Sequence, residues 1–123
     1  VIAVAVMDAR CNQVYTAIFN KGKRLCEDKA VLIDELGEEL KQYDKKIVFI
    51  GDGSLLCYEK LCEIIRNCDI ADEKIRYVHG SSIGFVAENL MKNGAELVNS
   101  ENLVPFYLRL PQAERELNNK LKK

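Results

Sequence analysis

The stretch Val1–Phe19, VIAVAVMDARCNQVYTAIF, decides the fold. It is rich in Val, Ile and Ala, it is broken once by the polar run Asp8–Gln13, and it is too short to span a membrane. This pattern predicts a buried strand, a tight turn and a second strand that pairs back on the first. Because one class of α/β fold binds phosphate at this turn, the turn is the first candidate site.

Composition narrows the function classes. The chain has 123 residues, 48% of them apolar, which suits one domain with a real core. Its 18 basic and 19 acidic side chains leave a net charge of −1, so no positive field favours nucleic-acid binding. Nothing resembles a signal peptide, and we expect a soluble, cytoplasmic protein without a membrane segment. Because the chain begins at Val1 and directly enters a strand, we expect it to be part of a longer protein.

The cysteines and the single histidine do not form a recognisable motif. The chain has five cysteines, at Cys11, Cys26, Cys57, Cys62 and Cys68, without a C-x-x-C pair. We expect reduced structural thiols and no metal, with Cys11 in the turn as the thiol to test for reactivity. His79 has no nearby base, orienting group or metal ligand in the sequence, so we expect it to be incidental.

Hydrophobic periodicity predicts the elements that follow. Strands are expected at residues 1–8, 14–19, 24–31, 46–50 and 75–78, and helices at 32–43, 54–68 and 82–93, followed by an extended apolar segment and a last helix from Pro111. Residues 69–74 are expected to be a polar connection. An antiparallel meander continued by right-handed crossovers gives a mixed five-stranded sheet of order 3-2-1-4-5, the ribonuclease-H-like or actin-like arrangement. Residues 1–98 would form this lobe and residues 99–123 a C-terminal tail.

The same periodicity predicts which helix faces are buried. The expected inward residues of the first helix are Ile33, Leu36, Leu40 and Tyr43. Those of the second are Leu55, Tyr58, Cys62 and Ile65, with Leu61, Ile64 and Cys68 widening the face, and those of the third are Ile83, Val86, Ala87 and Leu90. Ser54 is expected to cap the second helix, and Gly94 to end the third. The last helix has a thin apolar face, so we expect the tail to dock on something else.

Two strand-end loops are the candidate sites, because Asp8 and Asp52 should meet where neighbouring strands end. A two-metal nuclease would need further carboxylates there, for which Glu38, Glu39 and Glu88 are the candidates. The alternative is that the two aspartates shape their turns and the glutamates are solvated, and we favour it.

An actin-like ATPase lobe is the other chemistry to consider. The run Gly51, Asp52, Gly53 and Ser54 suits an adenosine loop, because glycine lets backbone approach a ligand closely. The turn with Asp8, Ala9, Arg10 and Asn12 has no glycine, and side chains there would obstruct the approach of phosphate. We interpret both loops as degenerate nucleotide-binding positions, and we expect no catalytic residue, no metal and no cofactor.

Two motifs carry a family resemblance. Met7-Asp8-Ala9-Arg10 with Val14-Tyr15, and Tyr107-Leu108-Arg109-Leu110-Pro111 with Ala113-Glu114, resemble the TsaB (YeaZ) family. The resemblance covers the whole chain but only the second, C-terminal lobe of the family's two-lobed, actin-like protein.

The resemblance implies a non-catalytic role. Proteins of this family support the TsaD synthase subunit, together with the ATPase TsaE, in forming threonylcarbamoyladenosine at position 37 of tRNA, and they meet tRNA only through the complex. The family also allows a homodimer of the full-length protein. Labels such as glycoprotease-like peptidase find no supporting catalytic residues here. Because the family's first lobe supplies much of the pairing surface, we expect Val1–Lys123 alone not to assemble normally with TsaD.

Three hypotheses therefore remain. The favoured one is a scaffold subunit of tRNA modification. The second is a nucleotide-binding lobe of an actin-like ATPase or kinase, which ATP titration would reveal. The third is a metal-dependent nuclease, which divalent-ion binding would reveal.

Overall fold

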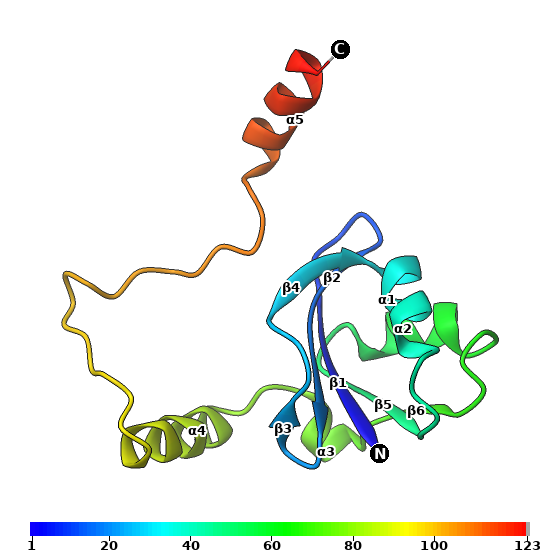
Figure 1. Ribbon diagram of the computed structural model, residues 1–123, viewed down its shortest axis with the longest axis horizontal. Helices are drawn as coiled ribbons and strands as arrows, with labels where there is room; N and C mark the ends of the chain where they lie inside the picture. The colour runs from blue at the N-terminus through cyan, green and yellow to red at the C-terminus, as the bar shows by residue number, and fades with distance from the viewer. Residues whose placement is uncertain (123) are drawn as a thin grey trace.

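The computed structural model describes residues 1–122 and builds its core on the predicted hairpin (Figure 1). Strand β1 (Ile2–Asp8) pairs antiparallel with β2 (Gln13–Asn20), in a register that sets Ile2 opposite Asn20 and Asp8 opposite Val14. Strand β5 (Ile47–Ile50) lies parallel to β1 on its other side, as the predicted crossover requires. The result is an α/β fold with a mixed sheet of order β3-β2-β1-β5-β6.

The predicted third strand is two short strands. β3 (Lys23–Arg24) follows a tight turn in which Lys21 and Gly22 have φ of 49° and 76°. β4 (Lys29–Leu32) then pairs with the other end of β2, so both short strands lie at the same edge of the sheet. The charged run between them does not continue the ladder. The prediction of a continuous strand over residues 24–31 is therefore wrong, although its edge position is right.

Helices α1 (Ile33–Leu40) and α2 (Ser54–Leu61) cover one face of the sheet (Figure 1). The inward residues of β1, β2 and β5 pack against them in the main cluster: Ile2, Val4, Val6, Val14, Ile18, Ile33, Leu36, Leu40, Ile47, Phe49, Cys57, Leu61 and Ile65. The predicted buried face of α1 is confirmed. Gly37 is where the two helices approach most closely, because a Cβ there would lie 2.7 Å from a methyl carbon of Leu61.

The predicted buried face of α2 is partly wrong. Leu61 and Ile65 are buried as predicted, but Leu55 and Ile64 are 47% and 45% exposed. Ser54 and Cys57, which were not predicted to face inward, are fully buried. The amide of Gly53, directly before the helix, donates to the Val6 carbonyl of β1 at 3.2 Å. Gly53 rather than Ser54 occupies the N-cap position, and no side chain caps the helix.

The last strand lies earlier in the chain than predicted. β6 (Cys68–Ile70) pairs parallel with β5, and an ion pair of 3.0 Å between Lys46 and Asp69 joins the two strands. Residues 75–78, predicted as a strand, do not form one: Ile75 and Arg76 end the short helix α3 (Glu73–Arg76), and Tyr77 and Val78 follow it. Asp72 caps this helix, since its carboxylate accepts the Lys74 amide at 3.0 Å. A three-residue strand carrying an Asp has no visible alternation, so only its pairing partner identifies it.

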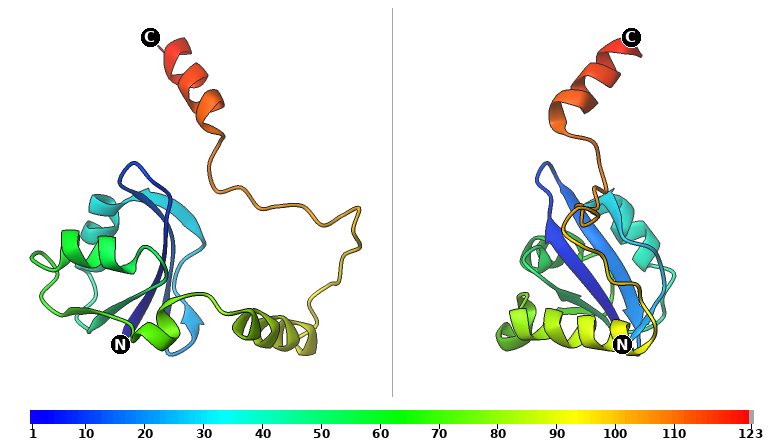
Figure 2. Two further views of the ribbon diagram at one scale, coloured as in Figure 1. Left: turned by 180° about the vertical axis from the view of Figure 1, so that it is seen from behind. Right: turned by 90° about the vertical axis from the view of Figure 1, so that its left-hand side faces the viewer.

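Helix α4 (Gly80–Lys92) extends away from the sheet, and every residue in it is exposed (Figures 1 and 2). Its predicted inward packing is therefore not seen, because Tyr77 and His79 are extended and carry the chain outward. The predicted stop is confirmed. Gly94 has φ of 86°, and the Ala95 amide donates to the Leu90 carbonyl at 3.0 Å.

The tail runs through solvent to helix α5 (Gln112–Leu121), which begins directly after Pro111 (Figure 1). Most of the apolar residues before this helix are exposed, with Phe106 at 82% and Tyr107 at 78%, whereas Leu108 is half-buried. All buried residues of the described chain lie between Ile2 and Ala71. None of the helices that the structure describes has the length and apolar character of a membrane span.

Candidate functional site

The turn between β1 and β2 has an unusual backbone. Arg10, Cys11 and Asn12 all have left-handed φ angles, of 64°, 53° and 59°. The Asp8 carboxylate accepts the Arg10 amide at 2.8 Å, and the Gln13 amide donates to the Arg10 carbonyl at 3.0 Å. Asp8 therefore shapes its turn, which is the interpretation favoured from the sequence.

The second loop closes against the first. The Asp52 carboxylate accepts the Asp8 amide at 3.0 Å, so the predicted meeting of the two loops is confirmed. Gly51 has φ of 115°, and a Cβ there would lie 2.1 Å from the Val6 carbonyl oxygen. A Cβ on Gly53 would lie 3.1 Å from the Asp8 amide nitrogen. The chain's own first strand therefore takes up the close approach that these two glycines allow.

Ser54 is the remaining residue of the predicted adenosine loop. Its side chain is fully buried at the start of α2, and its hydroxyl has no hydrogen-bond partner among the described residues. The predicted capping role is wrong, because the helix begins at Ser54, one residue earlier than a Ser54 cap requires. The hydroxyl is therefore a buried polar group at the start of α2.

The glutamates considered for a metal site do not gather at the aspartates. Each pairs with a lysine near it: Glu38 with Lys41, Glu39 with Lys29, and Glu88 with Lys92. Within residues 1–122, no three His, Cys, Asp or Glu side chains are placed to hold a metal ion together. The carboxylates of Asp8 and Asp52 are instead bound to backbone amides.

Arg109 is a site residue that the loop analysis missed. Its guanidinium donates to the Ala9 carbonyl and to the Gln13 side-chain oxygen, each at 2.7 Å. It also lies 5.4 Å from the ring centroid of Tyr15, within the range of a cation–π contact. The other side of the turn is held by Lys60, whose ammonium donates to the Asn12 side chain. The arginine of the Tyr107-Leu108-Arg109 motif was the only sequence signal for this contact.

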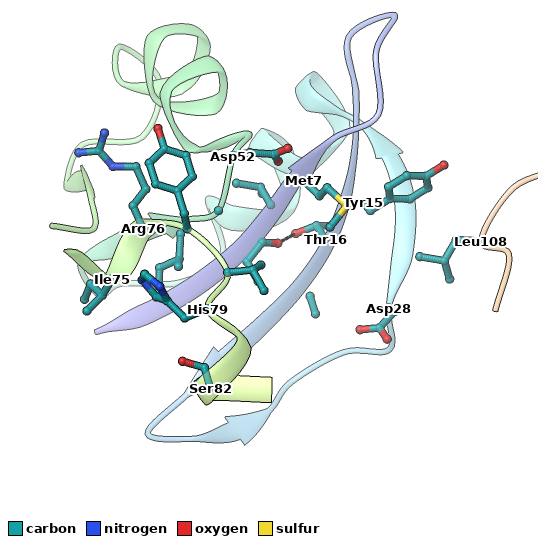
Figure 3. A pocket seen from close by; sticks show the side chains of 17 residues that line it. Met7, Tyr15, Thr16, Asp28, Asp52, Ile75, Arg76, His79, Ser82 and Leu108 are labelled. Carbon is teal, nitrogen blue, oxygen red and sulfur yellow. Dashed lines mark hydrogen bonds between the residues drawn. The ribbon is translucent and has the colours of Figure 1, made fainter. Parts of the chain in front are cut away.

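A groove of about 590 Å³ lies on the sheet face that α1 and α2 leave uncovered (Figure 3). Its walls are mostly apolar, but three charged residues also line it: Asp28, Asp52 and Arg76. The other lining residues are Ala5, Val6, Met7, Tyr15, Thr16, Ala17, Ile50, Gly51, Ile75, Tyr77, Val78, His79, Ser82 and Leu108. His79 is at the edge and donates from Nε2 to the Lys74 carbonyl at 2.9 Å. Gly51 and Asp52 of the predicted adenosine loop also line this groove. The sequence analysis did not identify the rest of the groove, because it forms only when separate strands are paired.

The five thiols differ in environment. Cys11 is exposed, Cys57 is buried, and the other three are half-buried. Burial raises the pKa of the Cys57 thiol to about 12; the Asp8 carboxylate adds to the rise and Lys60 opposes it. Since the thiolate is the nucleophile, Cys57 should be inert across the physiological pH range.

We expect a thiol-labelling experiment to separate these sites. At about pH 8, a maleimide should modify Cys11 first, and Cys57 only after denaturation, with peptide mass spectrometry locating each adduct. Raising the pH by one unit should not make Cys57 react with the maleimide, because the pH is still far below the thiol's pKa of about 12. The variant Cys11→Ser should lose the fastest phase. Rapid labelling of Cys57 in the folded protein would contradict its burial.

Comparison with known proteins finds one kind of likeness. No family model matches the chain, and no curated protein matches it. Among solved structures, it is similar to a protein from Pseudomonas aeruginosa described as uncharacterized with similarity to peptidase YEAZ, with a TM-score of 0.62 and 17% identity. The likeness covers 88% of this chain and 49% of that one, so this chain spans about half of its neighbour's length. This structural likeness shows that the chain has a YeaZ-like fold.

Proposed function

We propose that this chain is a lobe of a TsaB-type (YeaZ) protein, a non-catalytic cytoplasmic partner of a TsaD-type synthase subunit and a TsaE-type ATPase. In this role it supports the formation of threonylcarbamoyladenosine at position 37 of tRNA and meets the tRNA only through the complex. The fold would be the actin-like lobe with sheet order 3-2-1-4-5, if the two edge strands β3 and β4 are counted as one. The YeaZ-like fold supports this assignment.

The contact of Arg109 with the turn is the observation that carries the proposal. The family resemblance rests on two motifs that are about 100 residues apart in the sequence, and Arg109 of the second binds Ala9 of the first at a separation of 100 positions. The same guanidinium lies over Tyr15, another residue of the first motif. Two motifs that contact each other form one structural unit, which favours a common family origin over chance matches.

The two loops also favour a supporting role over nucleotide chemistry. An adenosine loop needs open space beside its glycines, but at Gly51 and Gly53 that space is occupied by Val6 and by the backbone of Asp8. A phosphate loop needs free backbone amides, but the Arg10 amide is bonded to the Asp8 carboxylate. We therefore place ATP chemistry in the partner subunits.

Reconstitution tests this proposal. The full-length protein that contains this chain, mixed with TsaD-type and TsaE-type subunits, ATP, threonine-derived donor and tRNA, should yield modified adenosine detectable by nucleoside mass spectrometry. Omitting the protein should abolish the product, and Val1–Lys123 alone should not replace it. Full activity without the protein would refute the role. Tight ATP binding by the isolated chain in calorimetry would favour the actin-like ATPase hypothesis instead.

A further inference from the structure

The C-terminal end of α4 carries the pair Asn93-Gly94, the only place in the sequence where a glycine follows an asparagine. Asn93 is the C-cap residue, with φ of −92° and ψ of 13°, and Gly94 follows with φ of 86°. Both residues are exposed, and nothing lies within 4 Å of a Cβ built on Gly94. The Asn93 side chain is therefore free to turn toward the backbone nitrogen that follows it.

An asparagine can react with the backbone that follows it, which makes it one of the thermolabile residues. The Gly94 nitrogen loses its proton and attacks Cγ of Asn93, the bond from Cγ to Nδ2 breaks, and ammonia leaves. Water then opens the resulting succinimide ring on either side, giving aspartate or isoaspartate, and nothing is oxidised or reduced. A following glycine favours the attack, because it has no Cβ to hinder the nitrogen and its backbone is the most adaptable.

Two hydrogen bonds of the helix end oppose this reaction. The Gly94 amide donates to the Met91 carbonyl at 3.1 Å, and Nδ2 of Asn93 donates to the Asn89 carbonyl at 2.9 Å. Both bonds lie in the last turn of a helix in which every residue is exposed (Figure 1). Because the ends of exposed helices open at little cost in free energy, these bonds slow the attack without preventing it.

The other asparagines lack this combination of features. Asn99 is the most similar, because the small residue Ser100 follows it. Its side-chain oxygen, however, accepts the backbone amides two and three positions further along the chain, each at 3.1 Å, and Ser100 has a Cβ. Asn20 lies in β2, and its side-chain oxygen is buried. Both the sequence and the surroundings therefore single out Asn93.

We propose that Asn93 is a modification site that deamidates without an enzyme, and that its conversion removes the stop of α4. The product places a carboxylate at the C-terminal end of a helix, where the helix dipole disfavours negative charge. Isoaspartate also adds a carbon atom to the backbone between the helix and Gly94. The Gly94 and Ala95 amides then lose the register in which they bind Met91 and Leu90. The inference does not depend on the proposed function.

Peptide mass spectrometry of the whole folded chain, kept at mildly alkaline pH, tests the site. Cleavage after glutamate separates Asn93 from Asn99, because Glu96 lies between them. Asn93 should convert about tenfold faster than Asn99 or more, and fragmentation should identify isoaspartate in the product. Hydrogen exchange at the Gly94 and Ala95 amides should then be about tenfold faster in the converted chain.

Two variants separate the chemistry from the stability of the helix. Asn93→Gln keeps the amide and leaves Gly94 in place, but its longer side chain would have to close a larger ring, so conversion at this position should fall about tenfold or more. Gly94→Ala adds a Cβ that contacts nothing but hinders the nitrogen, and conversion of Asn93 should fall similarly.

Three results would overturn the proposal. Equal conversion of Asn93 and Asn99 would mean that neither the glycine nor the helix end matters. Conversion of Asn93 in urea but not in the folded chain would show that the cap protects it. Unchanged hydrogen exchange at Gly94 and Ala95 after conversion would show that the helix stop survives.

Discussion

Replacing Gly51 with Ala should cost about 4 kcal/mol or more of unfolding free energy. The φ angle of Gly51 is 115°, where an L-amino acid is strained in any surroundings. The added Cβ would also lie 2.1 Å from the Val6 carbonyl oxygen. The obstacle is backbone in the central strand β1, so it cannot rotate away as a side chain would. The hydrogen bond from Asp8 to Asp52 in the next turn should weaken as well.

Gly22→Ala is the matched control for this variant. Gly22 also has a positive φ, of 76°, but nothing lies within 4 Å of the added Cβ. The variant should lose only the backbone term, about 1 kcal/mol. Urea denaturation followed by circular dichroism measures both losses. Similar losses in the two variants would show that φ strain, rather than the approach of Gly51 to Val6, accounts for the glycine in the loop.

Replacing Phe49 with Ala should cost about 3–5 kcal/mol. Phe49, in β5, is fully buried. It belongs to the core cluster that also contains residues of β1, α1 and α2. Removing the ring loses the free energy gained by burying it. It also leaves a cavity that the paired strands cannot move to fill. The transition midpoint in urea should fall while its slope is nearly unchanged, since the same surface is exposed on unfolding.

Phe106→Ala makes the same chemical change in the tail. Because Phe106 is 82% exposed, its loss should change the unfolding free energy by no more than about 0.5 kcal/mol. Comparing Phe49→Ala with Phe106→Ala tests whether the folded core ends near Ala71, as the burial pattern indicates. A large loss for Phe106→Ala would mean that the tail is packed in solution.

The first half of the fold follows from local pattern. The Val1–Phe19 run predicts the hairpin because β-branched and apolar residues on both sides of a polar turn have one efficient pairing. Ile33, Leu36 and Leu40 predict the buried face of α1 by spacing alone. The meeting of Asp8 and Asp52 was predictable as well, because neighbouring strands end at the same edge of the sheet.

Other features were decided by contacts between distant residues. The strand β6 has too few residues to show a pattern, and it is defined by its ladder with β5. The face that α2 buries is defined by the packing of Cys57 and Leu61 on the strands, which are distant in the sequence. Arg109 reaches the turn because the tail returns to it, and no local pattern encodes the end of such a path.

The sequence by itself determined the α/β class, the central hairpin, the buried face of α1 and the two loops that meet at Asp8 and Asp52. Only the tertiary structure decided the place of the last strand, the binding of Arg109 to the turn and the groove on the uncovered face. The physical reason is the distance along the sequence over which each kind of interaction acts. Hydrophobic periodicity acts over neighbouring turns and pleats, whereas a groove floor made by Ala5 and Ala17 exists only after two strands have paired.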